Sequence, residues 1–382
     1  MKIVLWLSCA GILYTYAVYP FLIWMLALCR PQRCRIASVS PSVSVVMAVH
    51  NGASLLPKKI EHLLRLDYPH VKEIIVVSDG STDDTAGLLS DYDNPILKSI
   101  ILQEHLGKAV AVNAGMKAAS GDVILFVDIR PEIQPGTLQK MLDYFADPKV
   151  GCVAGDLILL QDGHDSVSAA VGGLYWRYEQ WIRKCEAAYD SPVGVYGGCY
   201  AIRRALAVEQ PAGMILDDMF QPLSIIRQGY RSVFATGAHV FDKWPKSASG
   251  EFDRKVRTLA GNFQLVQMAP WILTLQNRVL LQFVSHKLMR LVVPYLVVLV
   301  LVCSLMLSPG SVFYALFAGV QICALALALA GLYFKVPVVD RLAAPAGALL
   351  VLNVAAVVGL YKFLATPGPL WKIWKPSAPV VM

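Results

Sequence analysis

The sequence predicts an α/β domain with a mixed, mainly parallel sheet, and transmembrane α-helices at both ends of the chain. From residue 43 to residue 128, short β-branched runs alternate with stretches of helical spacing, a pattern typical of a sheet with helices on both faces. Long apolar runs flank this region, so the 382-residue chain is 56% hydrophobic and 16% charged, which is more apolar than most soluble domains.

Four apolar runs have about the 20 residues that a helix needs to cross a bilayer. They cover residues 3–28, 291–307, 312–334 and 342–361. The first run could be a secretory signal, but its apolar part is longer than the usual 7 to 15 or so residues and no small-residue cleavage pattern follows. We therefore interpret residues 1–30 as a retained anchor. Arg30, Arg33 and Arg35 follow it, and the positive-inside rule then places the next segment in the cytoplasm.

The rest of the chain divides into a cytosolic domain, a membrane region and a tail. We expect the domain over residues 41–270, an interfacial amphipathic helix over 271–290, about three transmembrane helices over 291–364 and a tail over 365–382. Three later spans would leave the C-terminus outside the cytoplasm. The lysines and tryptophans of the tail instead suggest a cytosolic, interfacial position, and the sequence leaves this conflict open.

Composition excludes several other classes of protein. The formal charge of +7 lies largely near the predicted membrane boundaries, where attraction to anionic lipid headgroups explains it. We find no basic and aromatic stripe of the kind that binds nucleic acid. The eight cysteines show no CxxC pairing, so we interpret them as small apolar side chains in a reducing compartment and not as a disulfide frame or metal site.

Polar clusters follow the first two expected strands. His50 and Asn51 come after VSVVMAV, where a helix cap and turn would explain them. Asp79 ends the second strand in VVSDGSTDDT, and the hydroxyls and carboxylates of residues 81–84 can cap the next helix. Capping does not require Asp79. A carboxylate at this lip of a parallel sheet can instead accept hydrogen bonds from a nucleobase or ribose.

Two further clusters carry carboxylates at the ends of elements. In VILFVDIRP, Asp128 closes an apolar strand and could hold a divalent cation beside a phosphate group, while Arg130 could engage phosphate oxygens directly or form an ion pair with Asp128. In LDDMFQPLS, Asp217 and Asp218 precede a helical run. Capping explains one of the two aspartates, and the other is free to act as a general base.

Six segments in this order resemble glycosyltransferase family 2, in particular membrane-bound polysaccharide synthases such as cellulose, chitin and hyaluronan synthases. They are VSVVMAVHNG, EIIVVSDGSTDDT, GKAVAVNAGMKAASGDVILFVD, VYGGCYAIRRAL, LDDMFQPLSIIRQGYR and RKVRTLAGNFQ, and they span about residues 42–264. The resemblance implies a nucleotide-diphospho-sugar transferase (GT-A-like) fold. It also implies an inverting transferase that uses a nucleoside diphosphate sugar and a glycan or lipid-linked acceptor at the membrane.

The resemblance also implies roles for individual residues. Asp218 matches the catalytic base, and Asp128 matches the first aspartate of a DxD motif that binds Mg²⁺ or Mn²⁺. The implied donor-binding residues are Ala48, His50, Asn51, Asp79, Lys108, Asp128, Arg130, Arg254 and Arg257, and the implied acceptor-binding residues are Gly197, Gly198, Cys199, Asp217 and Gln264.

This sequence departs from the family pattern at two positions. Arg130 stands where the second aspartate of the DxD motif is expected, which puts strict metal dependence in doubt. Thr258 stands where the family commonly has the tryptophan of its QxxRW motif, which makes processive synthesis less secure. Two alternative functions stay open: transfer of one hexose to polyprenyl phosphate, and a catalytically inactive assembly partner of a synthase.

Overall fold

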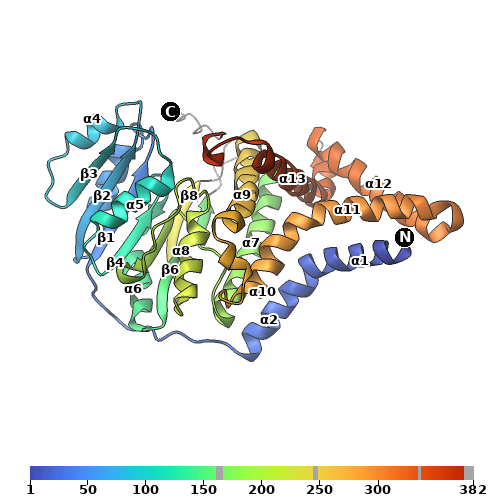
Figure 1. Ribbon diagram of the computed structural model, residues 1–382, viewed down its shortest axis with the longest axis horizontal. Helices are drawn as coiled ribbons and strands as arrows, with labels where there is room; N and C mark the ends of the chain where they lie inside the picture. The colour runs from blue at the N-terminus through green and yellow to red at the C-terminus, as the bar shows by residue number, and fades with distance from the viewer. Residues whose placement is uncertain (161–166, 244–247, 334–336, 374–382) are drawn as a thin grey trace.

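The computed structural model describes residues 1–160, 167–243, 248–333 and 337–373. Its centre is one eight-stranded sheet in the order β3-β2-β1-β4-β7-β6-β8-β5 (Figure 1). The strands are β1 (Val43–Val49), β2 (Val71–Asp79), β3 (Leu97–Leu102), β4 (Val123–Val127), β5 (Glu132–Ile133), β6 (Val150–Leu160), β7 (Cys199–Arg203) and β8 (Arg231–Lys243). Strands β1 to β4 pair in parallel, as do β6 and β8, whereas β7 and β5 run antiparallel to their neighbours. The expected mixed, mainly parallel sheet is confirmed.

Helices cover both faces of this sheet because its buried strands are apolar on both sides. One core contains Val45 and Met47 of β1 together with Ile60 of α3 (Leu56–Leu64), and it extends to α4 (Thr85–Ser90) and α6 (Thr137–Leu142). The opposite core contains Val46 of β1 with Ala111 of α5 (Lys108–Ala118), and it extends to α8 (Asp217–Arg227). Successive residues of β1 therefore supply two cores, as side-chain alternation along a strand requires.

A further layer of helices lies between the sheet and the membrane region. It contains α7 (Val167–Tyr189) and α9 (Ala248–Met268). Leu223 of α8 packs with Leu265 of α9 and with Phe283 of α10 (Leu280–Phe283) in a third core. The helix α8 is thus apolar towards both of its neighbouring layers, and its first turn, with Asp217 and Asp218, is fixed between them.

The two ends of the chain contain helices that are long and apolar. The first 29 residues form α1 (Lys2–Leu13) and α2 (Tyr19–Cys29), joined by a π-helical turn. The later ones are α11 (Met289–Leu307), α12 (Val312–Tyr333) and α13 (Pro337–Ala365), after which comes a short 3₁₀ turn, η7 (Leu370–Ile373). Within the described ranges, four stretches have the length and composition to cross a membrane: Lys2–Cys29, Leu280–Gly310, Val312–Gly331 and Ala346–Ala365. Their positions agree with the four apolar runs of the sequence.

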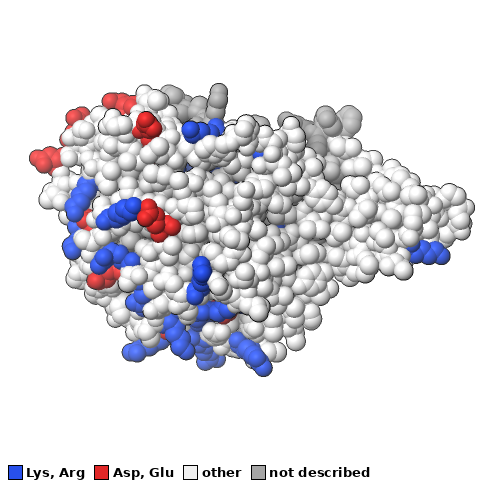
Figure 2. Space-filling view, in the orientation of Figure 1, with Lys and Arg blue, Asp and Glu red and all other residues white. Residues whose placement is uncertain are grey.

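The distribution of charged side chains separates these helices from the domain. On the face that Figure 2 shows, lysine, arginine, aspartate and glutamate side chains gather over the sheet and its helices. The part formed by the apolar helices is almost free of charge on this face, apart from a basic group at its far tip. A surface without charged groups suits contact with the hydrocarbon of a bilayer.

The segment expected as a separate amphipathic helix over 271–290 has a different form. A 3₁₀ turn covers Pro270–Leu273, and a helix that begins at Leu280 continues through a π-helical turn into α11. His286, fully buried, lies 3.0 Å from Glu179 and 2.8 Å from Glu186 of α7. Lys287 and Arg290 also pair with Glu179. The polar side chains that interrupt this apolar run therefore face carboxylates of α7. Because they are paired there, the helix can continue without turning them towards solvent.

Candidate active site

Asp79 organises the loop that precedes α5. Its carboxylate, only 2% exposed, accepts hydrogen bonds from the backbone N–H groups of Leu106 (2.8 Å) and Gly107 (2.9 Å) and from Nδ1 of His105 (2.9 Å). Gly107 has a φ of +95°, which glycine adopts without strain. The donors of this loop occupy both oxygens of Asp79, so its carboxylate shapes the loop in this conformation.

His50 and Asn51 lie on the same side of the sheet as Asp79. Nδ1 of His50 lies 2.7 Å from the backbone oxygen of Asp79, and its ring stacks on that of His105 with centroids 3.7 Å apart. Oδ1 of Asn51 accepts a hydrogen bond from the backbone N–H of Thr82, so this side chain caps the turn before α4. Ala48 packs against the second core from its place in β1.

Lys108, the first residue of α5, joins two of the predicted carboxylates. Its Nζ lies 3.0 Å from Oδ1 of Asp128 and 3.1 Å from Oδ2 of Asp217. Burial alone would lower the pKa of Lys108, but the attraction of Asp128 and Asp217 outweighs burial and raises it overall. A permanent positive charge is therefore placed between the end of β4 and the start of α8.

Asp218 is the carboxylate of this group that is poised to take up a proton. Burial, and then the negative charge of Asp217, raises its pKa to about 6, although Lys108 and Arg183 act in the opposite direction. Among the described residues, no hydrogen bond or ion pair holds the Asp218 carboxylate, whereas Asp217 is paired with Lys108. A free carboxylate with a pKa near neutrality has the properties of a general base.

The loop of Gly197 and Gly198 connects Asp218 to Asp128. A Cβ at Gly197 would lie 3.0 to 3.3 Å from side-chain atoms of Asp218, and the backbone oxygen of Gly198 accepts a hydrogen bond from the N–H of Asp128 at 3.0 Å. Gly197 thus lets the loop approach the Asp218 carboxylate closely, and Gly198 binds the backbone of Asp128. Cys199 was expected to contact the acceptor. It begins β7 instead, and its side chain is fully buried in the first core.

Arg130 and Arg254 are two cations near Asp242. Arg130 lies 3.3 Å from Asp242 of β8, which also accepts a hydrogen bond from the hydroxyl of Tyr196 at 2.9 Å. Arg130 therefore does not form an ion pair with Asp128. Burial lowers the pKa of Arg254, and the charge of Arg130 acts in the same direction, so the two guanidinium groups are close enough to affect each other. Arg257 is exposed on the same helix.

Gln264 of α9 is buried and holds the loop before α8. Its Oε1 accepts a hydrogen bond from the N–H of Ile215 (3.0 Å), and its Nε2 donates one to the backbone oxygen of Gly213 (2.9 Å). Both of its polar atoms are used in this way. Gln264 therefore positions the segment that carries Asp217 and Asp218, and its expected contact with an acceptor stays a prediction.

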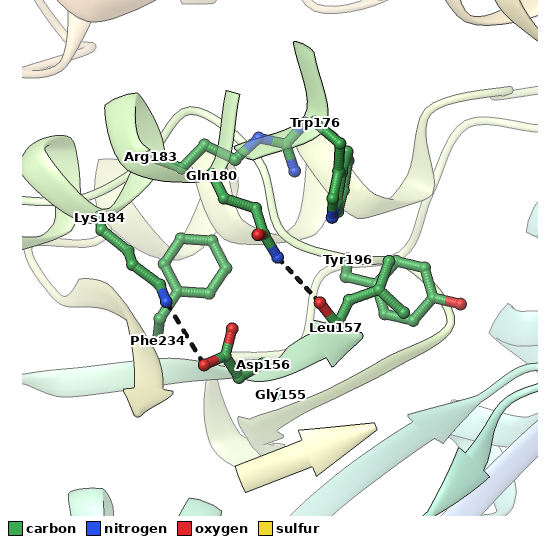
Figure 3. Close-up of a pocket in the computed structure, with 9 residues that line it drawn as sticks. All are labelled: Gly155, Asp156, Leu157, Trp176, Gln180, Arg183, Lys184, Tyr196 and Phe234. Atoms are coloured by element: carbon green, nitrogen blue, oxygen red, sulfur yellow. Dashed lines mark hydrogen bonds and ion pairs between the residues drawn. The ribbon is translucent and has the colours of Figure 1, made fainter. Parts of the chain in front are cut away.

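A cavity lies between β6, α7 and the loop of Tyr196 (Figure 3). Lys184 faces Asp156 across it at 3.4 Å, and Gln180 donates a hydrogen bond to the backbone oxygen of Leu157. Its remaining lining residues are Gly155, Trp176, Arg183, Tyr196 and Phe234. The indole Nε1 of Trp176 is buried and has no partner among the described residues. Aromatic surfaces beside cationic, amide and carboxylate groups suit a hydroxylated or anionic ligand.

The residues around Asp128 fit a divalent cation only if the ligand supplies part of its coordination. No group of three or more His, Cys, Asp or Glu side chains that could hold a metal ion occurs in the part of the chain that the structure describes. Asp128 is partly exposed, with a 38% exposed side chain. One carboxylate together with phosphate oxygens of a nucleotide is a common way to bind Mg²⁺, so Asp128 fits such an ion.

Sequence reasoning missed several residues of this site. His105 lies in the loop between β3 and α5, Asp242 near the end of β8, and Arg183 within an aromatic helix, so none of them stands in a recognisable motif. Lys59 was also missed. It is buried below the site, donates a hydrogen bond to the backbone oxygen of Pro131 and has its pKa lowered by burial. Of these residues, His105 alone could have been found from the sequence, because it lies three residues before Lys108.

Comparisons with known proteins identify relatives of part of this chain. Residues 44–210 match the family model described as glycosyl transferase family 2. The chain is 25% identical over 230 residues to the poly-beta-1,6-N-acetyl-D-glucosamine synthase of Staphylococcus aureus, covering 59% of this chain and 55% of that protein. It is 34% identical over 116 residues to the synthase of the same name from Staphylococcus epidermidis, covering 30% and 28%. The chain thus spans about half the length of these curated relatives.

A solved structure is similar over most of the chain. It is a mannosyltransferase from Pyrobaculum calidifontis in complex with GDP-Man and Mn²⁺, which superposes with a TM-score of 0.68 over 94% of this chain and 99% of that one. The sequence identity is 20%, so the likeness concerns the fold. It confirms the expected nucleotide-diphospho-sugar transferase (GT-A-like) architecture with apolar helices at both ends.

Proposed function

We propose that the protein, of which residues 44–210 match the glycosyl transferase family 2 model, is a glycosyltransferase that transfers a sugar from a nucleoside diphosphate sugar, with inversion, to a glycan acceptor at the membrane. The product would be an exopolysaccharide or cell-envelope polysaccharide. The similarity to two staphylococcal polysaccharide synthases supports the product class. The four apolar helices support action at a bilayer. Arg30, Arg33 and Arg35 after the first of them favour the cytoplasmic side for the domain.

One arrangement of charges carries this proposal. Lys108 holds Asp217 and Asp128 on one ammonium group, which leaves Asp218 unpaired beside them with a pKa of about 6. Inverting transfer needs a base on one side of the anomeric carbon and positive charge at the departing diphosphate on the other. The Asp218 carboxylate supplies the first, and Lys108, Arg130 and Arg254 supply the second.

The reaction follows from these positions. The Asp218 carboxylate takes a proton from the acceptor hydroxyl as the oxygen attacks the anomeric carbon, and the bond to the diphosphate breaks on the opposite side. Lys108 and the guanidinium groups of Arg130 and Arg254 stabilise the charge that develops on the diphosphate oxygens. A Mg²⁺ or Mn²⁺ ion, when bound through Asp128 and the nucleotide, supplies additional positive charge at the same group.

We place the acceptor side of the proposed site at the cavity of Figure 3. Tyr196 lines it and is followed directly by Gly197, which lies against Asp218. An acceptor sugar packed on the aromatic surfaces of Trp176 and Tyr196 would approach Asp218 from this side. The charge of Arg183, another lining residue, favours the ionised form of Asp218, so the cavity and the base are electrostatically connected.

A donor screen tests the proposed function. Purified protein in lipid vesicles is incubated with labelled nucleotide sugars and Mg²⁺ or Mn²⁺, and polymer, extended lipid-linked glycan and monosaccharyl lipid are separated. We expect polymeric or extended glycan product, and its loss in Asp218→Asn by about 10² to 10⁴, the usual effect of a positioned base. If monosaccharyl lipid is the sole product, the acceptor is polyprenyl phosphate and not a glycan. Nucleotide binding without turnover of any donor would contradict the proposal.

A further inference from the structure

The C-terminal segment returns to the catalytic domain after the last apolar helix. In η7, which contains residues 370–373, the indole of Trp371 lies beside Gly107 of the loop before α5 and Gly213 of the loop before α8. In Figure 1 this red turn lies beside the domain, away from the N-terminal tip of the helices. Residues 370–373 and the domain therefore lie on the same side of the membrane.

This position limits how many of the later helices can cross the bilayer. Between the domain and the tail lie three candidate spans, Leu280–Gly310, Val312–Gly331 and Ala346–Ala365. A chain that leaves one side of a membrane and returns to it crosses an even number of times. Two of the three therefore cross, and one stays on the side of the domain.

Of the three, α13 is the one whose C-terminal part, with Gly359 and Phe363 inside its apolar stretch, packs along α9 of the domain. Gly359 of α13 lies so close to α9 that an added Cβ would be 3.0 Å from the backbone nitrogen of Ala260. The rings of Phe363 and Phe263 stack with centroids 5.8 Å apart. Since α9 also carries Gln264, which holds the loop before α8, α13 is attached to the scaffold of the proposed active site.

Trp371 is fitted between the two loops that carry the charged groups. A Cβ at Gly107 would lie 2.9 Å from the indole, and one at Gly213 would lie 3.3 Å from it. Both glycines have positive φ, +95° and +84°, so no other residue is accommodated easily at either position. The indole also contacts the ring of His105 edge to face, with centroids 4.6 Å apart.

We propose that Trp371 is a positioning residue that completes the site from the C-terminal tail, and that α13 does not cross the membrane. This inference rests on the proposed function. The indole clamps the loop of Gly107, which leads directly into Lys108, against the loop of Gly213, which leads to Asp217 and Asp218. The distance between the cation and the proposed base is then maintained by a segment that follows the membrane helices.

The first test measures transfer kinetics of variants in lipid vesicles. Trp371→Ala should lower kcat/KM for the donor about 3- to 10-fold, as the loss of one aromatic contact does, while Trp371→Phe should retain most of it. Ile373→Ala, a change at an exposed residue of the same turn, is the matched control. The acid limb of the pH profile should stay unchanged, because Trp371 does not contact Asp218. Unchanged kinetics in Trp371→Ala, or faster transfer because the indole blocks the site, would overturn the proposal.

The second test does not depend on catalysis. Ile373→Cys is labelled with a membrane-impermeant maleimide in sealed vesicles of either orientation. The parent chain, which has cysteines of its own, gives the background labelling. Cleavage of the domain by added protease shows on which side of the vesicle membrane the domain lies. We expect labelling of Ile373→Cys on the side of the domain. Labelling on the opposite side would mean that α13 crosses, and would overturn the inference even if the transferase activity is confirmed. If no donor is turned over by the parent chain, the proposed function fails, and this labelling still decides the position of the tail.

Discussion

The ammonium group of Lys108 lies 3.0 Å from the carboxylate of Asp128, although the two residues belong to different elements of the sheet and its helical layer. The same ammonium group pairs with Asp217. Lys108 therefore determines how negative charge is distributed between the end of β4 and the start of α8, and this relationship leads to the first prediction.

Removal of the charge of Lys108 should reduce transfer strongly. We expect Lys108→Met to lower kcat/KM about 10² to 10³-fold, in the range of other preorganised electrostatic groups, and Lys108→Arg to be affected less because the charge is kept. Steady-state kinetics with the donor identified by the screen measures this. Lys117→Met is the control, since Lys117 pairs with Glu209 on the surface at the far end of the same helix. Equal activities of the two methionine variants would contradict the assignment.

The rate of transfer should depend on the ionisation of Asp218. Because its pKa is raised to about 6, kcat/KM should fall about tenfold per pH unit below about pH 6, as for a base that must be deprotonated. Asp217→Asn removes a neighbouring negative charge, so the acid limb should move to lower pH. The measurement is a pH profile of both proteins from about pH 4.5 to 8. An acid limb that stays in place in Asp217→Asn would show that Asp217 does not act on the titrating group.

The same raised pKa has a consequence for stability. The folded state holds the proton of Asp218 more tightly than the unfolded state, whose aspartates titrate near about 4. Ionisation therefore destabilises the fold progressively from about pH 4 to about pH 6, and the full penalty is present above about pH 6. We expect Asp218→Asn, although inactive, to have a Tm at about pH 7.5 equal to or above that of the parent chain. A Tm clearly below it would indicate that Asp218 stabilises the fold.

Metal dependence should rest on Asp128, the one carboxylate of the sequence Asp128-Ile129-Arg130. We expect chelation to reduce transfer and Mg²⁺ or Mn²⁺ to restore it, and Asp128→Asn to raise the metal concentration for half-maximal rate at least about tenfold, as weakened metal sites do. Titration of the rate with metal ion measures this. Arg130→Gln is the comparison, since Arg130 pairs with Asp242 and should change donor KM more than metal affinity. Full activity in chelator would contradict a metal requirement.

The ion-pair cluster around Glu179 should support the junction between the domain and the apolar helices. Glu179 pairs with His286, Lys287 and Arg290 in a buried environment. Glu179→Gln leaves Lys287 and Arg290 without this carboxylate, so we expect a loss of about 3 to 5 kcal/mol in the free energy of unfolding. Glu61→Gln breaks an exposed pair with Arg65 and should cost less than about 1 kcal/mol. Thermal unfolding in detergent compares them, and similar Tm values would mean that the cluster is not stabilising.

The sequence by itself determined the strands, the helices that join them and the order of the carboxylates. Runs such as VSVVMAV and VILFV are buried on both sides, so their composition alone identifies them as central strands. The carboxyl ends of parallel strands meet at one edge of a sheet. For this reason the positions of Asp79 and Asp128 in the sequence already predict that both residues lie at the same edge.

Only the tertiary structure decided which partner each polar group takes. Asp79 binds its own loop through His105, Arg130 faces Asp242, and Cys199 is buried in the core. These pairings join residues from about 26 to 112 positions apart, and no local pattern encodes them. The return of Trp371 to Gly107 is the extreme case. Hydropathy measures whether a helix can enter a bilayer, but packing of α13 against α9 determines whether it does.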